Sequence, residues 1–346
     1  MRAFLLALGL SALPLWGTDP AVPSVHGAGA TFPYPLYARW SHDYEALTGI
    51  AFNYQSIGSG GGILQVQNHT TDFGATDAPL TEAQLDKAGL DQFPMVIGGV
   101  VPVVNLPALG KTPLKLTGPV LADIFLGRVT RWNDPSIAAL NPGLRLPATE
   151  IGVVTRADGS GTTWLFTHYL SLVSGEWSQR VGAGTSVHWP LGIAGKGNEG
   201  VAGFLRQVEG SIGFLELAYA RPPLLAVVLK NRGGEFVPAG RNSFAAAARG
   251  ADWTASAAMA PSLLDRPDPA AWPITGASYI LVPRKIDDPA KARALVDFFT
   301  WCLGDGRKTA EATDYAPLDA DLAAGVKASW VRWAGKGETA PGGGHP

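Results

Sequence analysis

The stretch TRADGSGTTWLF, residues 155–166, places one arginine, one aspartate, two glycines and several hydroxyl side chains within a few positions. The guanidinium of Arg156 can donate two parallel hydrogen bonds to an oxyanion, while Asp158 holds its remaining nitrogens. The same spacing is also that of an ordinary surface ion pair. A carboxylate repels an anion unless the anion offers it a proton. We therefore expect an ion pair or a site that captures a protonated oxyanion without reacting it.

Three glycine-rich turns precede runs with helical spacing. They are GAGATFP, GSGGG and DGSGTT, at residues 27–33, 58–62 and 158–163. A helix N-terminus presents unpaired N–H groups and a partial positive charge, and glycine lets the backbone approach a ligand closely. Each turn taken singly is explained better as a helix cap. Their recurrence favours an anion site.

The elements that must position these turns alternate between strands and helices. Leu36, Trp40, Tyr44 and Leu47 have helical spacing, which predicts a helix from Thr31 onward. A capping box is predicted at residues 81–84, a helix start at residues 288–289, and a core position for the single cysteine at residue 302. The predicted strands are residues 50–57, 71–77, 95–106 and 150–156, and further helices are predicted at residues 119–127 and 160–173.

This alternation predicts an α/β protein with mostly parallel sheets. In such sheets ligands bind at the carboxyl ends of the strands. Thr31, Ser59, Asp77 and residues 156–162 all fall at predicted strand ends. Asp77 has two readings, as an acceptor for a proton on the ligand or as a cap for the turn before Pro79. We expect local dipoles to favour its ionised form.

Size and composition exclude several classes of protein. A chain of 346 residues is long enough for two ordinary cores, so we expect two lobes. Hydrophobic residues make up 46% and charged residues 16%, which is a globular composition. The formal net charge of −2 provides no broad positive field for nucleic acid or an acidic membrane. An anion site must therefore be local.

The residues at the N-terminus are typical of an exported protein. Residues 1–17 contain one arginine and an apolar run that is shorter than the ~20 residues needed to span a bilayer, as in a secretory signal peptide. An uncleaved anchor is the alternative. The only cysteine does not follow this leader, so neither a lipid anchor nor a disulfide is expected. We predict a periplasmic protein with a disordered tail at residues 334–346.

The sequence lacks the motifs of nucleotide-binding, hydrolytic and metal sites. A nucleotide fingerprint would need glycine at Phe32 or Ile63, no serine sits in a nucleophile elbow, and the six histidines are scattered. No catalytic residue, metal or cofactor is predicted. Two alternatives remain: a phosphatase with Ser160 or Ser59 as nucleophile, and a receptor for sulfate or molybdate.

Longer motifs carry a family resemblance between about His26 and Trp330. The chain resembles the PstS family of phosphate-binding proteins, the extracytoplasmic receptors of high-affinity phosphate ABC importers. The motifs that match are GAGATFPYPLYARW, NYQSIGSGGGI, DFGATDAPL, QFPMVIGGVV, TRADGSGTTWLFTHYL, GKGNEGVAGF, and GADW before AWPIT.

The resemblance implies a type II-like periplasmic-binding-protein fold, with two lobes of mixed, mostly parallel sheet flanked by helices and a cleft between them. Lobe 1 would comprise residues 22–101 and 276–333, and lobe 2 residues 102–275. It implies a monomer that binds inorganic phosphate and passes it to the permease and ATPase subunits of a transporter. Gly60 departs from the family, whose members often have serine there. The implied phosphate ligands are Thr31, the backbone N–H of Phe32, Ser59, Asp77, Arg156, Asp158, Ser160, Gly161 and Thr162.

Overall fold

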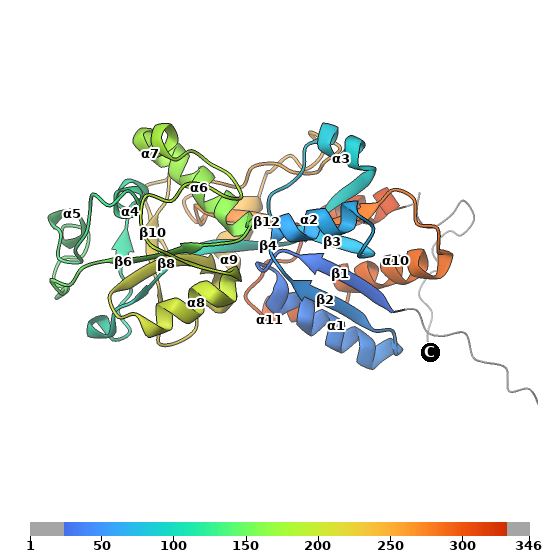
Figure 1. Ribbon diagram of the computed structural model, residues 1–346, viewed down its shortest axis with the longest axis horizontal. Coiled ribbons are helices and arrows are strands. Elements are labelled where there is room, and N and C mark those ends of the chain that lie inside the picture. Colours follow the sequence, from blue (N-terminus) through green and yellow to red (C-terminus); the bar gives the residue numbers. More distant parts are fainter. Residues whose placement is uncertain (1–23, 331–346) are drawn as a thin grey trace, which may run out of the picture.

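The computed structural model describes residues 24–330, so the predicted signal peptide and tail lie outside the described residues. Two lobes lie side by side, as Figure 1 shows. Lobe 1 contains the strands β1, β2, β3 and β12, and lobe 2 contains β6, β7 and β8. No helix within residues 24–330 is long and apolar enough to cross a membrane.

The elements alternate as the sequence predicts. The strands are β1 (Val25–Gly29), β2 (Phe52–Ser56), β3 (Phe73–Thr76), β4 (Leu90–Asn105), β5 (Lys115–Leu116), β6 (Gly152–Arg156), β7 (Ile193–Gly195), β8 (Ser211–Glu216), β9 (Leu225–Ala226), β10 (Val228–Lys230), β11 (Phe236–Val237) and β12 (Thr275–Pro283). The helices are α1 (Tyr34–Thr48), α2 (Ser59–Gln67), α3 (Glu82–Ala88), α4 (Gly118–Phe125), α5 (Pro135–Ala138), α6 (Gly161–Val173), α7 (Gly175–Arg180), α8 (Gly197–Gln207), α9 (Arg241–Ala248), α10 (Pro289–Leu303), α11 (Arg307–Ala312) and α12 (Ala320–Ser329).

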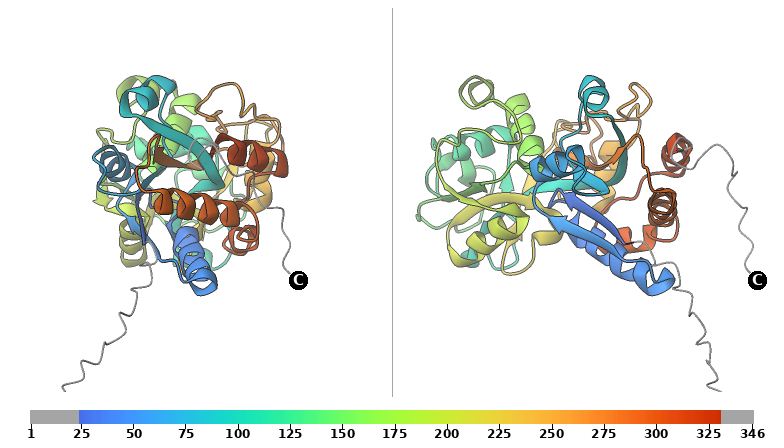
Figure 2. Two further views of the ribbon diagram at one scale, coloured as in Figure 1. Left: turned by 90° about the vertical axis from the view of Figure 1, so that its right-hand side faces the viewer. Right: turned by 45° about the vertical axis from the view of Figure 1, so that its right-hand side comes forward.

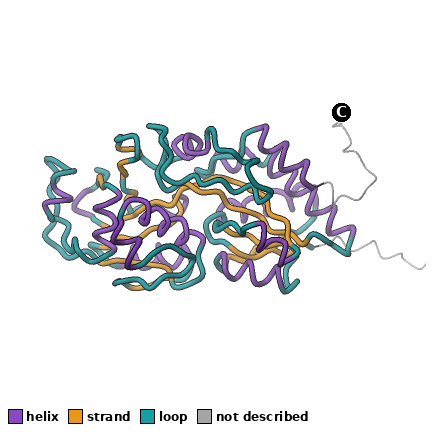
Figure 3. Tube along the Cα trace, turned by 90° about the horizontal axis from the view of Figure 1, so that it is seen from above, coloured by secondary structure: helices purple, strands orange, loops and turns teal. Residues whose placement is uncertain are grey.

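One long strand joins the two lobes. The main sheet has the order β2-β1-β3-β12-β4-β8-β6-β7. The first part of β4 pairs antiparallel with β12, and its last residues pair antiparallel with β8. Figure 3 shows the strands running from one lobe into the other. The sheet is therefore mixed at its centre, and the lobe limits near Val101 and Thr275 remain predictions.

The outer strands on each side of this centre are parallel. In lobe 1, β1 pairs with β2 and β3, and in lobe 2, β6 pairs with β7 and β8. Helices α1, α2 and α10 contact the strands of lobe 1, and α6 and α8 contact those of lobe 2. The strand ends that lead into α1, α2, α6 and α8 are the places where an α/β sheet presents a ligand site.

Aromatic side chains fill the core of each lobe. In lobe 1, Tyr44 of α1 packs edge-on against Phe298 of α10, with ring centroids 5.1 Å apart. Figure 2 shows these two helices side by side although they lie at opposite ends of the chain. In lobe 2, Phe166 of α6 stacks on Phe214 of β8 at 4.1 Å. Cys302 is buried in the core, as predicted.

Most local signals at the helix ends are confirmed. Thr81 and Gln84 form the predicted capping box, and the side chain of Asp288 caps α10. The predicted start of the first helix is wrong by three residues, because Thr31 lies in a turn and α1 begins at Tyr34. Leu47, the last of the four residues with helical spacing, lies near the end of α1 and is 67% exposed.

Candidate functional site

Lobe 1 contributes three turns to the cleft. Thr31 and Phe32 lie between β1 and α1, Ser59 is the first residue of α2, and Asp77 follows β3. All four residues are buried. The Phe32 carbonyl accepts a hydrogen bond from the Tyr315 hydroxyl at 2.7 Å, which fixes the backbone of this turn. The parallel pairing of β1 with β2 and β3 brings the three turns to one edge of the sheet.

Lobe 2 contributes the segment from Arg156 to Thr162. Arg156 ends β6, and Ser160 is the N-cap of α6, where its side-chain oxygen accepts from the Thr163 N–H at 3.0 Å. Gly161 and Thr162 form the first turn of α6 and are buried. Ser160 therefore does cap α6, which is the alternative role that the sequence suggested for such turns. Its hydroxyl proton is still available for donation.

The two sets of residues meet across the cleft. The N–H of Gly161 donates to Ser59 Oγ at 3.0 Å, and the N–H of Gly60 donates to the carbonyl of Gly159 at 2.9 Å. A Cβ atom added to Gly161 would lie 2.6 Å from Asp77 Oδ2 and from Ser59 Oγ. The glycine is therefore required for the start of α6 to approach lobe 1 this closely.

Arg156 and Asp158 form a buried bidentate ion pair. Arg156 Nε donates to Asp158 Oδ1 at 2.8 Å, and Nη2 donates to Oδ2 at 2.6 Å. Asp158 Oδ1 also accepts from the Gly197 N–H at 3.0 Å. Burial opposes the ionisation of Asp158, but the hydrogen bond and charge of Arg156 outweigh it and lower the pKa of the carboxyl. Arg156 Nη1 is buried and has no hydrogen-bond partner in the described part of the chain, so this nitrogen is available to an anion.

Neither buried carboxylate oxygen of Asp77 has a hydrogen-bond partner of ordinary geometry among the described residues, although the hydroxyls of Ser278 and Ser59 lie near enough to stabilise its charged form. Burial raises the pKa of this carboxyl to about 7, against smaller opposing effects of Ser278, Arg156 and Ser59. The local groups therefore favour the ionised form of Asp77, as expected, but burial opposes them and leaves the pKa of the carboxyl near neutrality. Desolvation disfavours the charged form more strongly than the nearby donors favour it.

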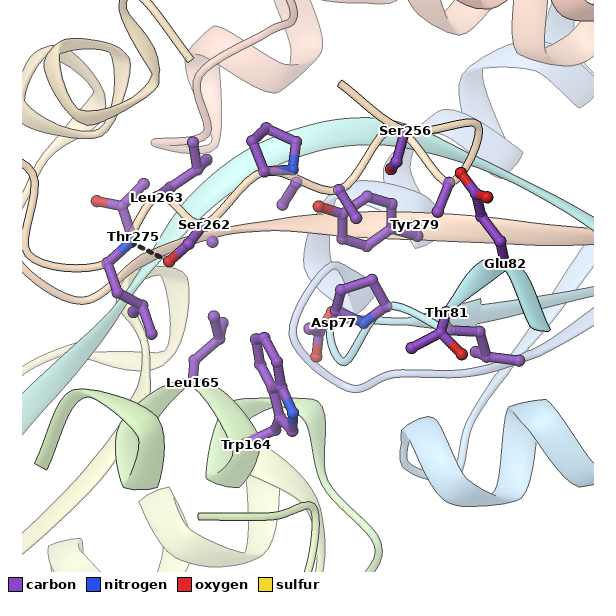
Figure 4. Close-up of a pocket in the computed structure, with 18 residues that line it drawn as sticks. Asp77, Thr81, Glu82, Trp164, Leu165, Ser256, Ser262, Leu263, Thr275 and Tyr279 are labelled. Carbon is purple, nitrogen blue, oxygen red and sulfur yellow. Dashed lines mark hydrogen bonds between the residues drawn. The ribbon is translucent and has the colours of Figure 1, made fainter. Parts of the chain in front are cut away.

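The site therefore combines donors with a group that exchanges a proton. Arg156 Nη1 and the hydroxyls can donate to an oxyanion, while Asp77 can accept a hydrogen bond from a protonated oxygen. Asp77 also borders a cavity of about 400 Å³ between the lobes. Figure 4 shows Asp77 near Trp164 and Leu165 of α6 and Tyr279 of β12, which also line this cavity.

The predicted site residues are buried except Asp158, whose side chain is 10% exposed. Asp77 is 1% exposed and Arg156 is 4% exposed. Within residues 24–330, no group of three His, Cys, Asp or Glu side chains is placed to hold a metal ion.

Sequence reasoning missed three residues that join the two sides, two in α8 and one in the turn that follows β8. Asn198, the second residue of α8, donates to Thr31 Oγ1, and the Tyr219 hydroxyl donates to the Thr31 carbonyl at 2.7 Å. Glu199 accepts from Ser56 Oγ at 3.0 Å across the cleft. The GKGNEG run, residues 195–200, has the same glycine-rich pattern at a helix start as the other turns, so the sequence could have indicated that α8 belongs to the site.

Comparison with known proteins places the chain in a family. The model of the PBP superfamily domain matches residues 17–305. The phosphate-binding protein PstS of Xylella fastidiosa strain Temecula1 is 52% identical over 308 residues, which are 89% of this chain and 85% of the relative. The phosphate-binding protein PstS of Haemophilus influenzae is 49% identical, over 89% of this chain and 92% of its own length.

Solved structures share the fold. A high-affinity periplasmic phosphate-binding protein, PfluDING, solved with bound phosphate, matches with a TM-score of 0.72 at 23% identity, over 89% of this chain and 94% of the other. A phosphate-binding protein from Stenotrophomonas maltophilia matches with a TM-score of 0.66 at 19% identity, over 88% and 93%. The predicted two-lobed periplasmic-binding-protein fold is confirmed. From the identity to its curated relatives, the chain belongs to the PstS family of phosphate-binding proteins, which are receptors and not enzymes.

Proposed function

We propose that this member of the PstS family, a phosphate-binding receptor of a phosphate ABC transporter, encloses one dehydrated inorganic phosphate ion between its lobes. The anion would lie among the N-termini of α2, α6 and α8, where hydrogen bonds already connect the lobes. Lobe separation would admit the ion, and closure would remove its water. No covalent step is involved.

One observation supports this proposal most directly. Among residues 24–330, Arg156 Nη1 and both oxygens of Asp77 are buried without a hydrogen-bond partner of ordinary geometry, and only the nearby hydroxyls of Ser278 and Ser59 offer Asp77 partial compensation. Leaving such groups unpaired costs about 1–3 kcal/mol each, so their presence in one cleft calls for a ligand that satisfies them together. HPO₄²⁻ and H₂PO₄⁻ each offer acceptor oxygens to Arg156 and a hydroxyl proton to Asp77. Sulfate offers only the acceptors.

The nine predicted ligands have different roles in this proposal. Arg156 contacts the anion, while Asp158, whose oxygens are engaged by Arg156 and Gly197, holds the guanidinium in place. Asp77 accepts the ligand's proton. The remaining predicted donors are the hydroxyls of Thr31, Ser59, Ser160 and Thr162 and the N–H of Phe32. The Gly161 N–H, which donates to Ser59 Oγ in this structure, would turn to the anion when it binds.

We further propose that the protein works in the periplasm as a monomer and delivers phosphate to membrane subunits. The apolar leader at residues 1–17 favours export. The solved relative PfluDING is itself named a periplasmic phosphate-binding protein. N-terminal sequencing of the exported protein and its mass by light scattering would check the leader and the monomeric state.

A calorimetric titration tests the main proposal. The protein without its leader is titrated with inorganic phosphate, sulfate and a phosphate monoester. We expect saturable one-to-one binding of phosphate at micromolar affinity or better, which corresponds to about −8 kcal/mol. Tighter binding of sulfate would favour a receptor for another oxyanion. Release of phosphate from the monoester at an enzyme-like rate would favour a hydrolase.

A further inference from the structure

Asn198 connects hydroxyl groups on both sides of the cleft. Its backbone N–H and its Nδ2 donate to Thr31 Oγ1 of lobe 1, at 3.1 and 2.7 Å. Nδ2 also lies 3.3 Å from Thr162 Oγ1 of α6. The side chain is fully buried. Asn198 is thus the one residue that these hydrogen bonds link to a predicted phosphate ligand in each lobe.

The orientation of the Asn198 amide is determined by β8. The N–H of Glu216, at the end of that strand, donates to Asn198 Oδ1 at 3.0 Å. Only the oxygen of the amide can accept from this group, so the NH₂ group must face the two threonines. The backbone of lobe 2 therefore decides which end of the amide reaches the cleft.

This orientation restricts the hydroxyl of Thr31. A hydroxyl has one proton to donate and two lone pairs that accept. Both lone pairs of Thr31 Oγ1 are engaged by the two N–H donors of Asn198. The remaining capacity of this hydroxyl is donation. Thr162 Oγ1 likewise accepts from Nδ2, which turns its proton away from Asn198.

We propose that Asn198 is a positioning residue that makes Thr31 and Thr162 act as hydrogen-bond donors toward the bound anion. The inference rests on the proposed function, because it assumes that phosphate occupies this cleft. A threonine that turned its lone pairs toward an oxyanion would repel it. Asn198 excludes that arrangement and, because Thr31 belongs to the opposite lobe, does so only when the lobes meet.

The first test is a double-mutant cycle between Asn198→Ala and Thr31→Val, measured by titration with inorganic phosphate. Each single substitution should weaken binding about 10-fold to 100-fold, as expected for the loss of a hydrogen bond to a charged group. Asn198→Ala should cost at least threefold less in the Thr31→Val background, because the hydroxyl that it orients is gone. An equal loss in both backgrounds would mean that Asn198 has only a structural role.

A second variant tests the direction of the proton. In Asn198→Asp the side chain has almost the same shape but accepts instead of donating, so it would draw the Thr31 proton away from the anion. We expect this variant to bind phosphate more weakly than Asn198→Ala. Binding equal to or tighter than that of Asn198→Ala would overturn the proposal.

Asn141→Ala is the matched control. Asn141 is a buried asparagine of lobe 2 whose amide bonds the backbone of Lys115, away from the cleft. It should lower the thermal unfolding midpoint of the phosphate-free protein and leave phosphate affinity within about twofold.

If the Asn198 variants do not fold, Thr31→Val decides alone, since unchanged phosphate binding there contradicts the inference. Failure of the unmodified protein to bind phosphate would instead refute the proposed function.

Discussion

The N–H of Gly161 in lobe 2 donates a hydrogen bond to the hydroxyl oxygen of Ser59 in lobe 1, over 3.0 Å. Ser59 Oγ also accepts from the Asp77 N–H at 3.3 Å. Both lone pairs of this oxygen are engaged, so its proton can only be donated, either to the Asp77 carboxylate or to a ligand. Ser59 therefore contacts the opposite lobe and, because of that contact, can use its own proton only to donate to Asp77 or to a ligand.

Gly161→Ala should prevent full closure of the lobes. Its methyl group would lie 2.6 Å from atoms of Asp77 and Ser59, which is closer than real Cβ contacts. We expect small-angle scattering to show compaction on addition of phosphate in the unmodified protein and little in this variant, with weaker phosphate binding.

Gly175→Ala is the control for this change. Gly175 is also the first residue of a helix after a serine N-cap, but a Cβ atom there meets nothing within 4 Å. It should compact and bind phosphate as the unmodified protein does. Identical scattering curves with and without phosphate in the unmodified protein would contradict hinge closure itself.

Arg156→Ala should weaken phosphate binding by about 2–5 kcal/mol. Truncating one partner of a desolvated charge pair costs about this much, and Asp158 would then face the anion without its cation. Calorimetric titration measures the loss. Arg131→Ala, which removes an exposed ion pair with Glu150, should leave binding unchanged. Equal affinities for Arg156→Ala and the unmodified protein would place Arg156 outside the binding site.

Discrimination against sulfate should increase with pH. Sulfate brings no proton, so it can use Asp77 only in its protonated form, whose population falls about tenfold per unit above the pKa of about 7. HPO₄²⁻ carries its own proton and should not show this loss. We expect sulfate binding to weaken by about that factor between pH 7.5 and 8.5 while phosphate binding changes little.

Asp77→Asn should remove this pH dependence. An amide can turn its NH₂ group toward sulfate, so the variant should lose discrimination more than phosphate affinity. Rejection of an anion that lacks a required hydrogen bond can reach about 10⁴–10⁵. If the variant still rejects sulfate fully and binds phosphate normally, Asp77 is not the group that senses the proton.

The phosphate-free protein should become less stable as pH rises from 5 to 8.5. Burial raises the pKa of Asp77 to about 7 and that of Glu216 to about 8, so the folded state holds protons that the unfolded chain releases near pH 4. Their contribution is fully present below about pH 4 and is lost as pH rises through 7 and 8. The slope is at most about 1.4 kcal/mol per pH unit for each group.

Denaturant unfolding at several pH values measures this slope. Asp77→Asn and Glu216→Gln should each flatten it, because neither replacement titrates. Glu235→Gln, which alters an exposed carboxyl, serves as the control. A free energy of unfolding that stays constant or rises over this range would show that neither carboxyl is protonated in the folded protein.

Short-range features of the site could be predicted because neighbouring residues determine them. Arg156 and Asp158 are two positions apart, and the cap at Ser160 depends on a backbone group three residues away. The strand-turn-helix order at Ser59 and Gly161 is likewise a local pattern, and it places both residues at strand ends. The sequence by itself therefore determined the fold class and the segments around Ser59 and Gly161 that meet at the cleft.

Only the tertiary structure decided which residues of those segments hydrogen-bond to one another and which become buried. Asn198 reaches Thr31 from 167 positions along the chain, and Tyr315 reaches Phe32 from 283 positions away. The net shift in the pKa of Asp77 has the same origin, since its burial depends on residues from other elements, such as Gly161 of α6, that lie against its side chain. Hydrogen-bond partners and desolvation depend on distances between remote segments, and no spacing within a single stretch of sequence encodes those distances.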